Sequence, residues 1–289
     1  MRSGDFSKTA MMLKFIRREL NLGLALLGFL VAALSAGIGI GGGAIFVPLL
    51  MSVFRFDFKK AARTSLAAII PISLVGAVSH LVLLSPLPPL RYYLMFIPMC
   101  ILGTILGGRI AQKRKDRWLK FAFSLFLIIV SLKILEIFDF PRLFFSSLYE
   151  ILLANETLVL IIFGVTIGFI AIHLGIGCGL LIVPFYVIVM KLDMRQAISI
   201  SLTSMFFLTF SATLIHRRLK TLDFTPLKSL LGPALIGAVL GALISSHLPA
   251  SLLRQLFGVF LLVIAGKYSL QELWAYYRSL KPSLSYKSN

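Results

Sequence analysis

Long apolar runs separated by short polar clusters make up most of this chain. A helix needs about 20 mainly apolar residues to cross the hydrocarbon core of a bilayer. The pattern therefore predicts an all-α integral membrane protein, because no polar segment between the runs is long enough for a soluble domain. The runs are Leu22–Leu34 with a glycine-rich continuation to Val53, Leu66–Leu84, Tyr92–Leu106, Leu119–Leu135, Leu158–Met190, Ala197–Ile215, Leu227–Ile244 and Leu252–Leu270.

The second half of the chain repeats the order of residues in the first. At a shift of 136 positions, the segment Gly39-Ile40-Gly41-Gly42-Gly43 aligns with Gly175-Ile176-Gly177-Cys178-Gly179, and Val47-Pro48 aligns with Val183-Pro184. At a shift of 134, Gly103 and Gly107 align with Gly237 and Gly241. Matching residues in the same order indicate an internal duplication. The predicted organisation is a basic cytoplasmic lead-in (1–21), a first membrane repeat (22–138), an external linker (139–156), a second membrane repeat (157–273) and a cytoplasmic tail (274–289).

The Lys and Arg residues choose between two membrane topologies. Each half has four apolar elements, but eight full spans would place several basic clusters on the outer side, against the positive-inside rule. If the first element of each half is broken at its glycines and re-entrant, most of the 29 Lys and Arg residues become cytoplasmic. Three full spans per half then make the two halves antiparallel. We expect two homologous inverted-topology halves, each with a Gly-broken or re-entrant first element and three transmembrane helices.

Composition and charge agree with a membrane protein and exclude other classes. Hydrophobic residues make up 58% of the chain and charged residues 14%, with a net charge of +18. A nucleic-acid-binding protein gathers basic residues on one soluble face, whereas these residues flank apolar spans. Cys100 and Cys178 both lie inside apolar runs, so they indicate no disulfide framework.

The duplicated glycine motif is the strongest candidate for a binding site. Glycine permits backbone conformations that other residues avoid, and the proline after each motif tends to kink a helix. Non-helical backbone survives in a membrane where it is buried in protein or lines a wet cavity, and N–H groups freed at a helix start suit an anion. The alternative is close helix packing through small residues.

Further candidates surround this motif. Hydroxyls at the expected starts of the following helices could bind an oxyanion, although helix capping or interhelical hydrogen bonding explains them equally well. Cys178 replaces a glycine and could contact a sulfur-containing substrate, while His173 precedes the second motif. The predicted substrate-binding residues are Gly39, Gly41, Gly42, Gly43, Thr64, Ser65, His173, Gly175, Gly177, Cys178, Gly179, Ser201 and Ser204.

A second group is predicted to couple or gate movement. His80 and His216 occupy equivalent ends of equivalent helices, and histidine titrates near neutral pH. As residues at the membrane interface, however, they need no such role. Arg63 would supply a counter-charge if it faced inward, or would simply belong to the basic cytoplasmic cluster. Pro48 and Pro184 complete this group.

No arrangement of residues indicates catalysis. The apolar spans contain no carboxylate pair, no His/Cys spacing typical of a metal site and no nucleophile elbow. We therefore expect a protein that is not an enzyme and that needs no cofactor or metal. The lack of acidic residues within the spans also disfavours a cation transporter.

The segment from Gly39 to Pro48, the later Thr64-Ser65-Leu66 and their echoes in the second half resemble the TauE/SafE sulfite exporter family. The resemblance covers about residues 22–273. It implies a bacterial or archaeal plasma-membrane permease with two related halves that moves sulfite, sulfonates or related organosulfur anions. Cys178, and Ile200-Ser201 in place of Thr64-Ser65, depart from the pattern of the first half. These departures leave open whether both half-sites contact substrate equally.

The expected function is therefore a secondary transporter that exports a small sulfur-containing anion by alternating access between two repeats. The alternatives are an uptake permease for thiosulfate or another anion, a non-transporting membrane scaffold and an intramembrane lipid enzyme. The expected partners are the anion and the lipid bilayer, without nucleic acid, and a homodimer is one candidate assembly. We expect both termini in the cytoplasm.

Overall fold

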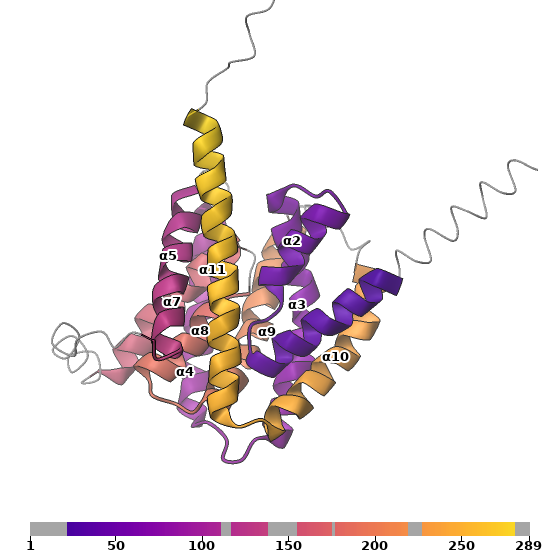
Figure 1. Ribbon diagram of the computed structural model, residues 1–289. Helices are drawn as coiled ribbons and strands as arrows, with labels where there is room; N and C mark the ends of the chain where they lie inside the picture. The colour runs from indigo at the N-terminus through magenta and orange to yellow at the C-terminus, as the bar shows by residue number, and fades with distance from the viewer. Residues whose placement is uncertain (1–21, 111–116, 138–154, 175–176, 219–226, 281–289) are drawn as a thin grey trace, which may run out of the picture.

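The computed structural model describes residues 22–110, 117–137, 155–174, 177–218 and 227–280, and these residues form helices with no β-strand (Figure 1). The expected all-α membrane fold is confirmed. The first half contains a helix over Leu22–Ile38, α2 (Gly43–Val53), α3 (Phe58–Leu83), α4 (Leu90–Ile110) and α5 (Arg117–Ile134). The second half contains α7 (Glu156–Leu174), α8 (Gly179–Pro184), its π-helical continuation η1 (Phe185–Val189), α9 (Met194–Arg218), α10 (Leu227–His247) and α11 (Ala250–Leu280).

Five helices in the described part of the chain are long and apolar enough to cross a membrane, namely α3, α4, α9, α10 and α11. They correspond to five of the six full spans that the sequence predicts. The sixth corresponds to α5, whose apolar described part is Ser124–Ile134. The predicted lead-in, most of the external linker and the end of the cytoplasmic tail lie outside the described residues.

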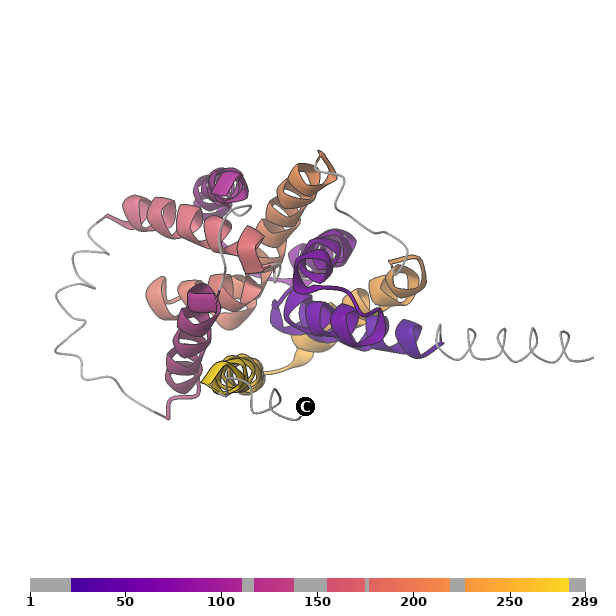
Figure 2. The same ribbon diagram turned by 90° about the horizontal axis from the view of Figure 1, so that it is seen from above.

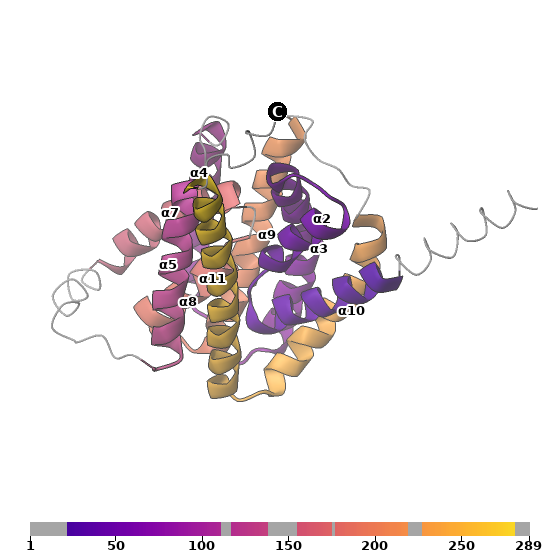
Figure 3. The same ribbon diagram turned by 45° about the horizontal axis from the view of Figure 1, so that its top comes forward.

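The first element of the chain is broken in the middle, as its glycines predict. The Leu22–Ile38 helix and the 11-residue α2 are about 26 Å and 17 Å long at 1.5 Å per residue. Each is therefore shorter than the hydrocarbon core of about 30 Å. Between them the chain turns back, so that α2 rises from the point to which the preceding helix descends (Figures 1 and 3).

The equivalent first helices of the two halves have similar inclinations to the long helix α11. Seen from above, the Leu22–Ile38 helix and α7 lie on opposite sides of the molecule, and both are strongly inclined to α11, which appears end-on (Figure 2). In the second half, the break after α7 is followed by α8 and η1, which together are as short as α2. Both halves therefore begin with a helix, a break and a second, short helical segment.

Glycines bring the inclined helices into backbone contact with their neighbours. Gly237 and Gly241 of α10 lie directly against the backbone carbonyls of Phe29 and Ala33 in the Leu22–Ile38 helix. Gly103 and Gly107 of α4 lie in the same way against the backbone of Val165 and Phe169 in α7. These are the glycines that align at a shift of 134, so the equivalent positions make equivalent contacts. Close packing through small residues is the role of these four glycines.

The helices α3 and α9 form the centre of the molecule. They pack against each other, and each also packs against a helix of the other half, α10 for α3 and α4 for α9. In Figure 1 the α2–α3 connection and the C-terminal end of α11 lie at one end of the molecule, whereas the α3–α4 and α10–α11 connections lie at the other. We call the latter the α3–α4 end below.

Candidate functional site

The two glycine breaks meet in the interior, between α3 and α9. A Cβ on Gly41 would collide with the sulfur of Met205 in α9, and a Cβ on Gly177 would lie 3.1 Å from Cδ1 of Ile69 in α3. Ile69 and Met205 are themselves equivalent at the shift of 136 residues. All four residues are buried or nearly so. The breaks and the two central helices therefore form one junction, which we call the central junction.

Left-handed backbone conformations explain why the breaks need glycine. The φ angles of Gly39, Gly41, Gly42 and Gly177 are 75°, 82°, 69° and 77°. A side chain at such a φ collides with the following carbonyl at a cost of about 1–2 kcal/mol, which glycine avoids. Both predicted breaks thus contain the non-helical backbone that the sequence indicates, inside the protein, where its polar groups are shielded from lipid.

The two breaks also touch each other. A Cβ on Gly179 would lie 2.7 Å from the carbonyl carbon and from the oxygen of Ile40, and would also meet the carbonyl of Gly39. Only glycine allows the backbones of the two halves to approach so closely. Gly43 begins α2 and is buried, whereas Gly175 lies outside the described residues.

Hydroxyl groups surround this junction, and one of them joins the two halves. Ser201 of α9 donates a hydrogen bond of 2.8 Å to the carbonyl oxygen of Gly39. Its equivalent, Ser65 of α3, is fully buried, and its hydroxyl has no hydrogen-bond partner among the described residues. Because residues four apart share a helix face, Ser65 and Ser201 lie on the same faces as Ile69 and Met205.

Three more buried hydroxyls in this region have no hydrogen-bond partner within the part of the chain that the structure describes. They belong to Ser35, Thr64 and Ser204, whose exposed fractions are 1%, 0% and 0%. Ser35 is nevertheless tied to the first break, since its carbonyl accepts the N–H of Ile40 at 3.1 Å. A buried polar group without a partner costs about 1–3 kcal/mol. The group of four unpaired hydroxyls therefore needs an explanation other than stability.

The hydroxyls do not lie at helix starts, which corrects one expectation. Helix α3 begins at Phe58, so Thr64 and Ser65 lie in its second turn, and the capping interpretation of these residues is wrong. Asp57 caps α3 by accepting the N–H of Lys60 at 3.3 Å. The helices that begin at the junction are the short ones, α2 and α8, whose N-cap residues Gly42 and Cys178 make no side-chain capping bond.

Cys178 adopts the same left-handed conformation as the glycine that it replaces, with φ 58°. A non-glycine residue at this φ is strained, and such strain persists only where the surroundings impose it. The buried thiol points towards α7, where it donates to the carbonyl of Ile167 at 3.4 Å. In this structure the thiol is therefore engaged by protein, away from the role of a substrate contact.

His80 lies near the end of α3, but it is buried rather than exposed at an interface. Its Nε2 is 2.8 Å from the carbonyl oxygen of Ala36 and 3.4 Å from the hydroxyl of Ser245. The ring thus connects α3 to the Leu22–Ile38 helix and to α10. The side chains of His173 and His216 lie outside the described part of the structure.

The remaining predicted residues border the junction. Arg63 is half-buried, one residue before Thr64. Pro48 lies inside α2, and Pro184 ends α8 where the helix widens into η1. A π-helical turn inside a helix often marks a functional site.

Sequence reasoning missed several residues of the central junction. Ser35, Ile69 and Met205 were not predicted, although the shift of 136 residues pairs the last two and could have indicated them. The hydrogen bond of 3.1 Å between the hydroxyls of Tyr93 and Ser199 also joins the halves, and no sequence signal pointed to Tyr93.

Among the described residues, no group of three or more His, Cys, Asp and Glu side chains could hold a metal ion.

Two curated proteins of Bacillus subtilis (strain 168) resemble this chain. The probable membrane transporter protein YunE is 31% identical over 117 residues, which is 40% of this chain and 42% of that protein. The chain thus matches less than half the length of this relative. The probable membrane transporter protein YjnA is 25% identical over 240 residues, which is 79% of this chain and 90% of that protein. No solved structure matches the chain.

The chain also matches a protein-family model over both glycine motifs. The model of the family described as sulfite exporter TauE/SafE matches residues 6–134 and 160–287, which include both breaks and both central helices. Together with the relatives, this match identifies a multi-pass membrane transporter rather than an enzyme. The chain belongs to the sulfite exporter TauE/SafE family.

Proposed function

We propose that this transporter exports a small sulfur-containing anion, such as sulfite or an organosulfonate, through the central junction. The observation that carries the proposal is the meeting of two left-handed glycine breaks beside four buried hydroxyls without partners. Hydroxyl groups and the N–H groups at the starts of α2 and α8 would bind the oxygen atoms of such an anion. The duplicated motif would supply both halves of the site, with Ser65 and Ser204 as direct contacts.

Alternating access would follow from rocking of one half against the other. The contacts between α3 and α9, and between the two breaks, support a binding site at the meeting point of the halves. We infer inverted-topology halves with both termini in the cytoplasm of a bacterial or archaeal plasma membrane. Arg55 in the α2–α3 connection and Lys59, Lys60 and Arg63 in the first part of α3 support this orientation, because the cytoplasmic side is enriched in Lys and Arg.

The membrane potential favours export over uptake. Movement of one negative charge out of a negatively charged cytoplasm gains about 2.3 kcal/mol per 100 mV. Export therefore needs no coupling ion, whereas uptake of thiosulfate or a related anion would need one. His80 is one described residue that could take part in such coupling, because its buried ring joins α3 to the Leu22–Ile38 helix and to α10.

The experiment compares hydroxyls that differ in their hydrogen bonding. The purified protein is heated in detergent with sulfite, thiosulfate, sulfoacetate, taurine, sulfate or phosphate, and the stabilisation by each is recorded. A ligand at 100 times its Kd stabilises the folded state by about 2.7 kcal/mol. We expect Ser65→Ala and Ser204→Ala to keep the stability of the ligand-free protein but to lose most of the stabilisation by one sulfur anion.

Ser201→Ala is the matched control, because it removes a hydroxyl that the protein itself uses. It should lower the stability of the ligand-free protein by about 1–3 kcal/mol, the cost of an unpaired buried carbonyl. If no anion stabilises the wild-type protein and reconstituted protein moves none, the proposal fails. A membrane scaffold then becomes the better interpretation, and turnover of lipid by the purified protein would favour the enzyme alternative.

A further inference from the structure

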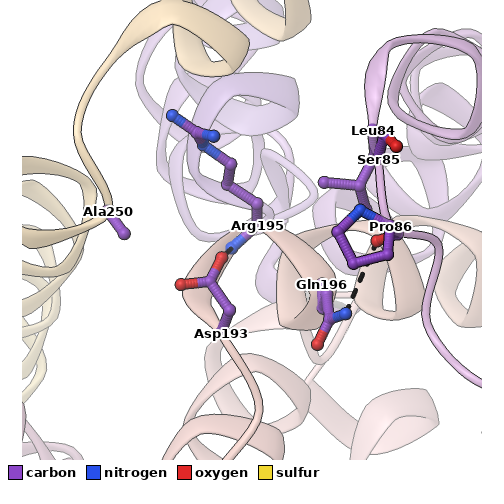
Figure 4. Close-up of a pocket in the computed structure, with 7 residues that line it drawn as sticks. All are labelled: Leu84, Ser85, Pro86, Asp193, Arg195, Gln196 and Ala250. Atoms are coloured by element: carbon purple, nitrogen blue, oxygen red, sulfur yellow. Dashed lines mark hydrogen bonds between the residues drawn. The ribbon is translucent and has the colours of Figure 1, made fainter.

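A polar cavity lies at the α3–α4 end of the molecule, away from the central junction (Figures 1 and 4). Its volume is about 320 Å³. Ser85 and Pro86 of the α3–α4 connection line it from the first half, and the second half contributes Asp193, Arg195 and Gln196 at the start of α9 and Ala250 at the start of α11. The cavity is therefore built by both halves.

Arg195 is the cation of this cavity, and no carboxylate neutralises it within the described structure. One terminal N–H of its guanidinium donates to the carbonyl of Leu248 at 2.7 Å, and its Nε is buried without a hydrogen-bond partner. Two other described arginines have a carboxylate partner, since Arg91 pairs with Glu156 at 3.2 Å and Arg254 with Glu136 at 3.0 Å. The Nε of Arg254 is also buried without a partner among the described residues, so the carboxylate is what distinguishes Arg254 from Arg195.

Asp193 lines the same cavity but serves the backbone. Its carboxylate accepts the N–H of Arg195 at 3.0 Å, which satisfies a free donor at the first turn of α9. Figure 4 shows the guanidinium of Arg195 directed away from this carboxylate. Gln196 donates to the carbonyl of Pro86 at 3.5 Å and so links the start of α9 to the α3–α4 connection.

We propose that this cavity binds a small oxyanion against the guanidinium of Arg195. A planar guanidinium is the side chain best suited to the oxygen atoms of sulfur and phosphorus oxyanions. A water molecule occupies about 30 Å³ in the liquid, so the cavity has room for a small anion together with water. Its role in transport rests on the proposed function. In that role the cavity is a second anion-binding site, on the outer side of the central junction, which we call the outer station.

Chemical protection tests the site without any need for transport. Full-length protein in detergent is treated with phenylglyoxal, which modifies guanidinium groups, and the modified peptides are quantified by mass spectrometry. We expect sulfite, sulfate or methanesulfonate to slow the modification of Arg195 in a saturable manner, but not that of Arg254. Equal protection of both arginines, or no protection of Arg195, would overturn the proposal.

A lipid phosphate could offer the same chemistry from the membrane surface. A parallel sample therefore contains phosphatidylglycerol in mixed micelles and no free oxyanion. Protection by the free anions in lipid-free detergent supports the soluble ligand. Protection by phosphatidylglycerol alone would assign Arg195 to lipid binding and overturn the station.

Transport kinetics then test the role of the site. In proteoliposomes of known orientation, Arg195→Gln should raise the half-saturating anion concentration about ten- to hundredfold from the outer face, the loss expected for charge-assisted hydrogen bonds. The maximal rate and the inner face should be unaffected, Arg195→Lys should recover part of the affinity, and Arg254→Gln should behave as wild type. An equal effect from both faces would contradict an outer station. If wild type carries no anion but Arg195 is still protected, the proposed function fails and the binding site stands.

Discussion

The substitution Gly41→Ala tests the geometry of the central junction directly. Gly41 has φ 82°, and a new Cβ would collide with the sulfur of Met205 and lie 2.9 Å from its Cε. The left-handed conformation alone should cost about 1–2 kcal/mol. Overpacking against a buried side chain should add about 1–3 kcal/mol. We therefore expect Gly41→Ala to lower the free energy of unfolding by about 2–5 kcal/mol.

The two contributions can be separated with a second substitution. Met205→Val removes the sulfur and the terminal methyl group, which are the atoms that the new Cβ would meet. In the Met205→Val background, only the cost of the left-handed conformation should remain, about 1–2 kcal/mol. The difference between the two backgrounds is the interaction energy of a double-mutant cycle, and we expect about 1–3 kcal/mol.

Thermal unfolding of the four proteins in one detergent measures the cycle. The monodisperse fraction that survives heating gives Tm for each, and a change of 1 kcal/mol corresponds to a shift of about 2–4 °C for chains of roughly this size. An equal effect of Gly41→Ala in both backgrounds would refute the contact with Met205. A tolerated Gly41→Ala would refute the left-handed break itself.

Three further predictions concern packing and electrostatics. Gly241→Ala should lower the free energy of unfolding by about 1–3 kcal/mol or more, because the new Cβ would meet a backbone carbonyl. Gly266 faces open space, so Gly266→Ala should be neutral or stabilising. Equal Tm shifts for the two variants would contradict this prediction. Arg254→Gln should change stability by less than about 1 kcal/mol, because Glu136 is largely exposed and Arg254 partly exposed, so that solvent screens the pair. A larger loss in Tm would mean that this pair holds the halves together. His80→Ala should cost about 1–3 kcal/mol by unpairing a buried carbonyl, and unchanged thermal stability would show that the ring has no structural role.

Hydropathy and glycine spacing determined much of the architecture from the sequence alone. In hydrocarbon every backbone polar group must be satisfied within the protein, and a single apolar run of about 20 residues satisfies its own groups as a helix. The glycines at 39–43 and 175–179 predicted the two breaks for a related reason, since glycine at such density weakens a helix. A local property of each segment was enough in both cases, and the structure has the helices and breaks in these places.

Equivalent residues in the two halves show what local patterns could not decide. Ser65 and Ser201 align in the repeat and have the same side chain, yet Ser201 donates to Gly39 while Ser65 has no partner. Thr64 and Ser65 were expected at a helix start, but α3 begins earlier, at Phe58. The role of each hydroxyl depends on the backbone packed against it, and the two halves are not identical there.

By itself, the sequence determined the class of protein and the sites of its two breaks, because these follow from the hydropathy and backbone flexibility of short segments. Only the tertiary structure decided which glycines serve a left-handed turn and which serve a close helix contact. It also decided which buried hydroxyls are paired, and that the Arg195 guanidinium has no carboxylate partner among the described residues. The physical reason is that these properties arise from contacts between segments far apart in the chain, such as Gly39 and Ser201, and no local pattern encodes such distances.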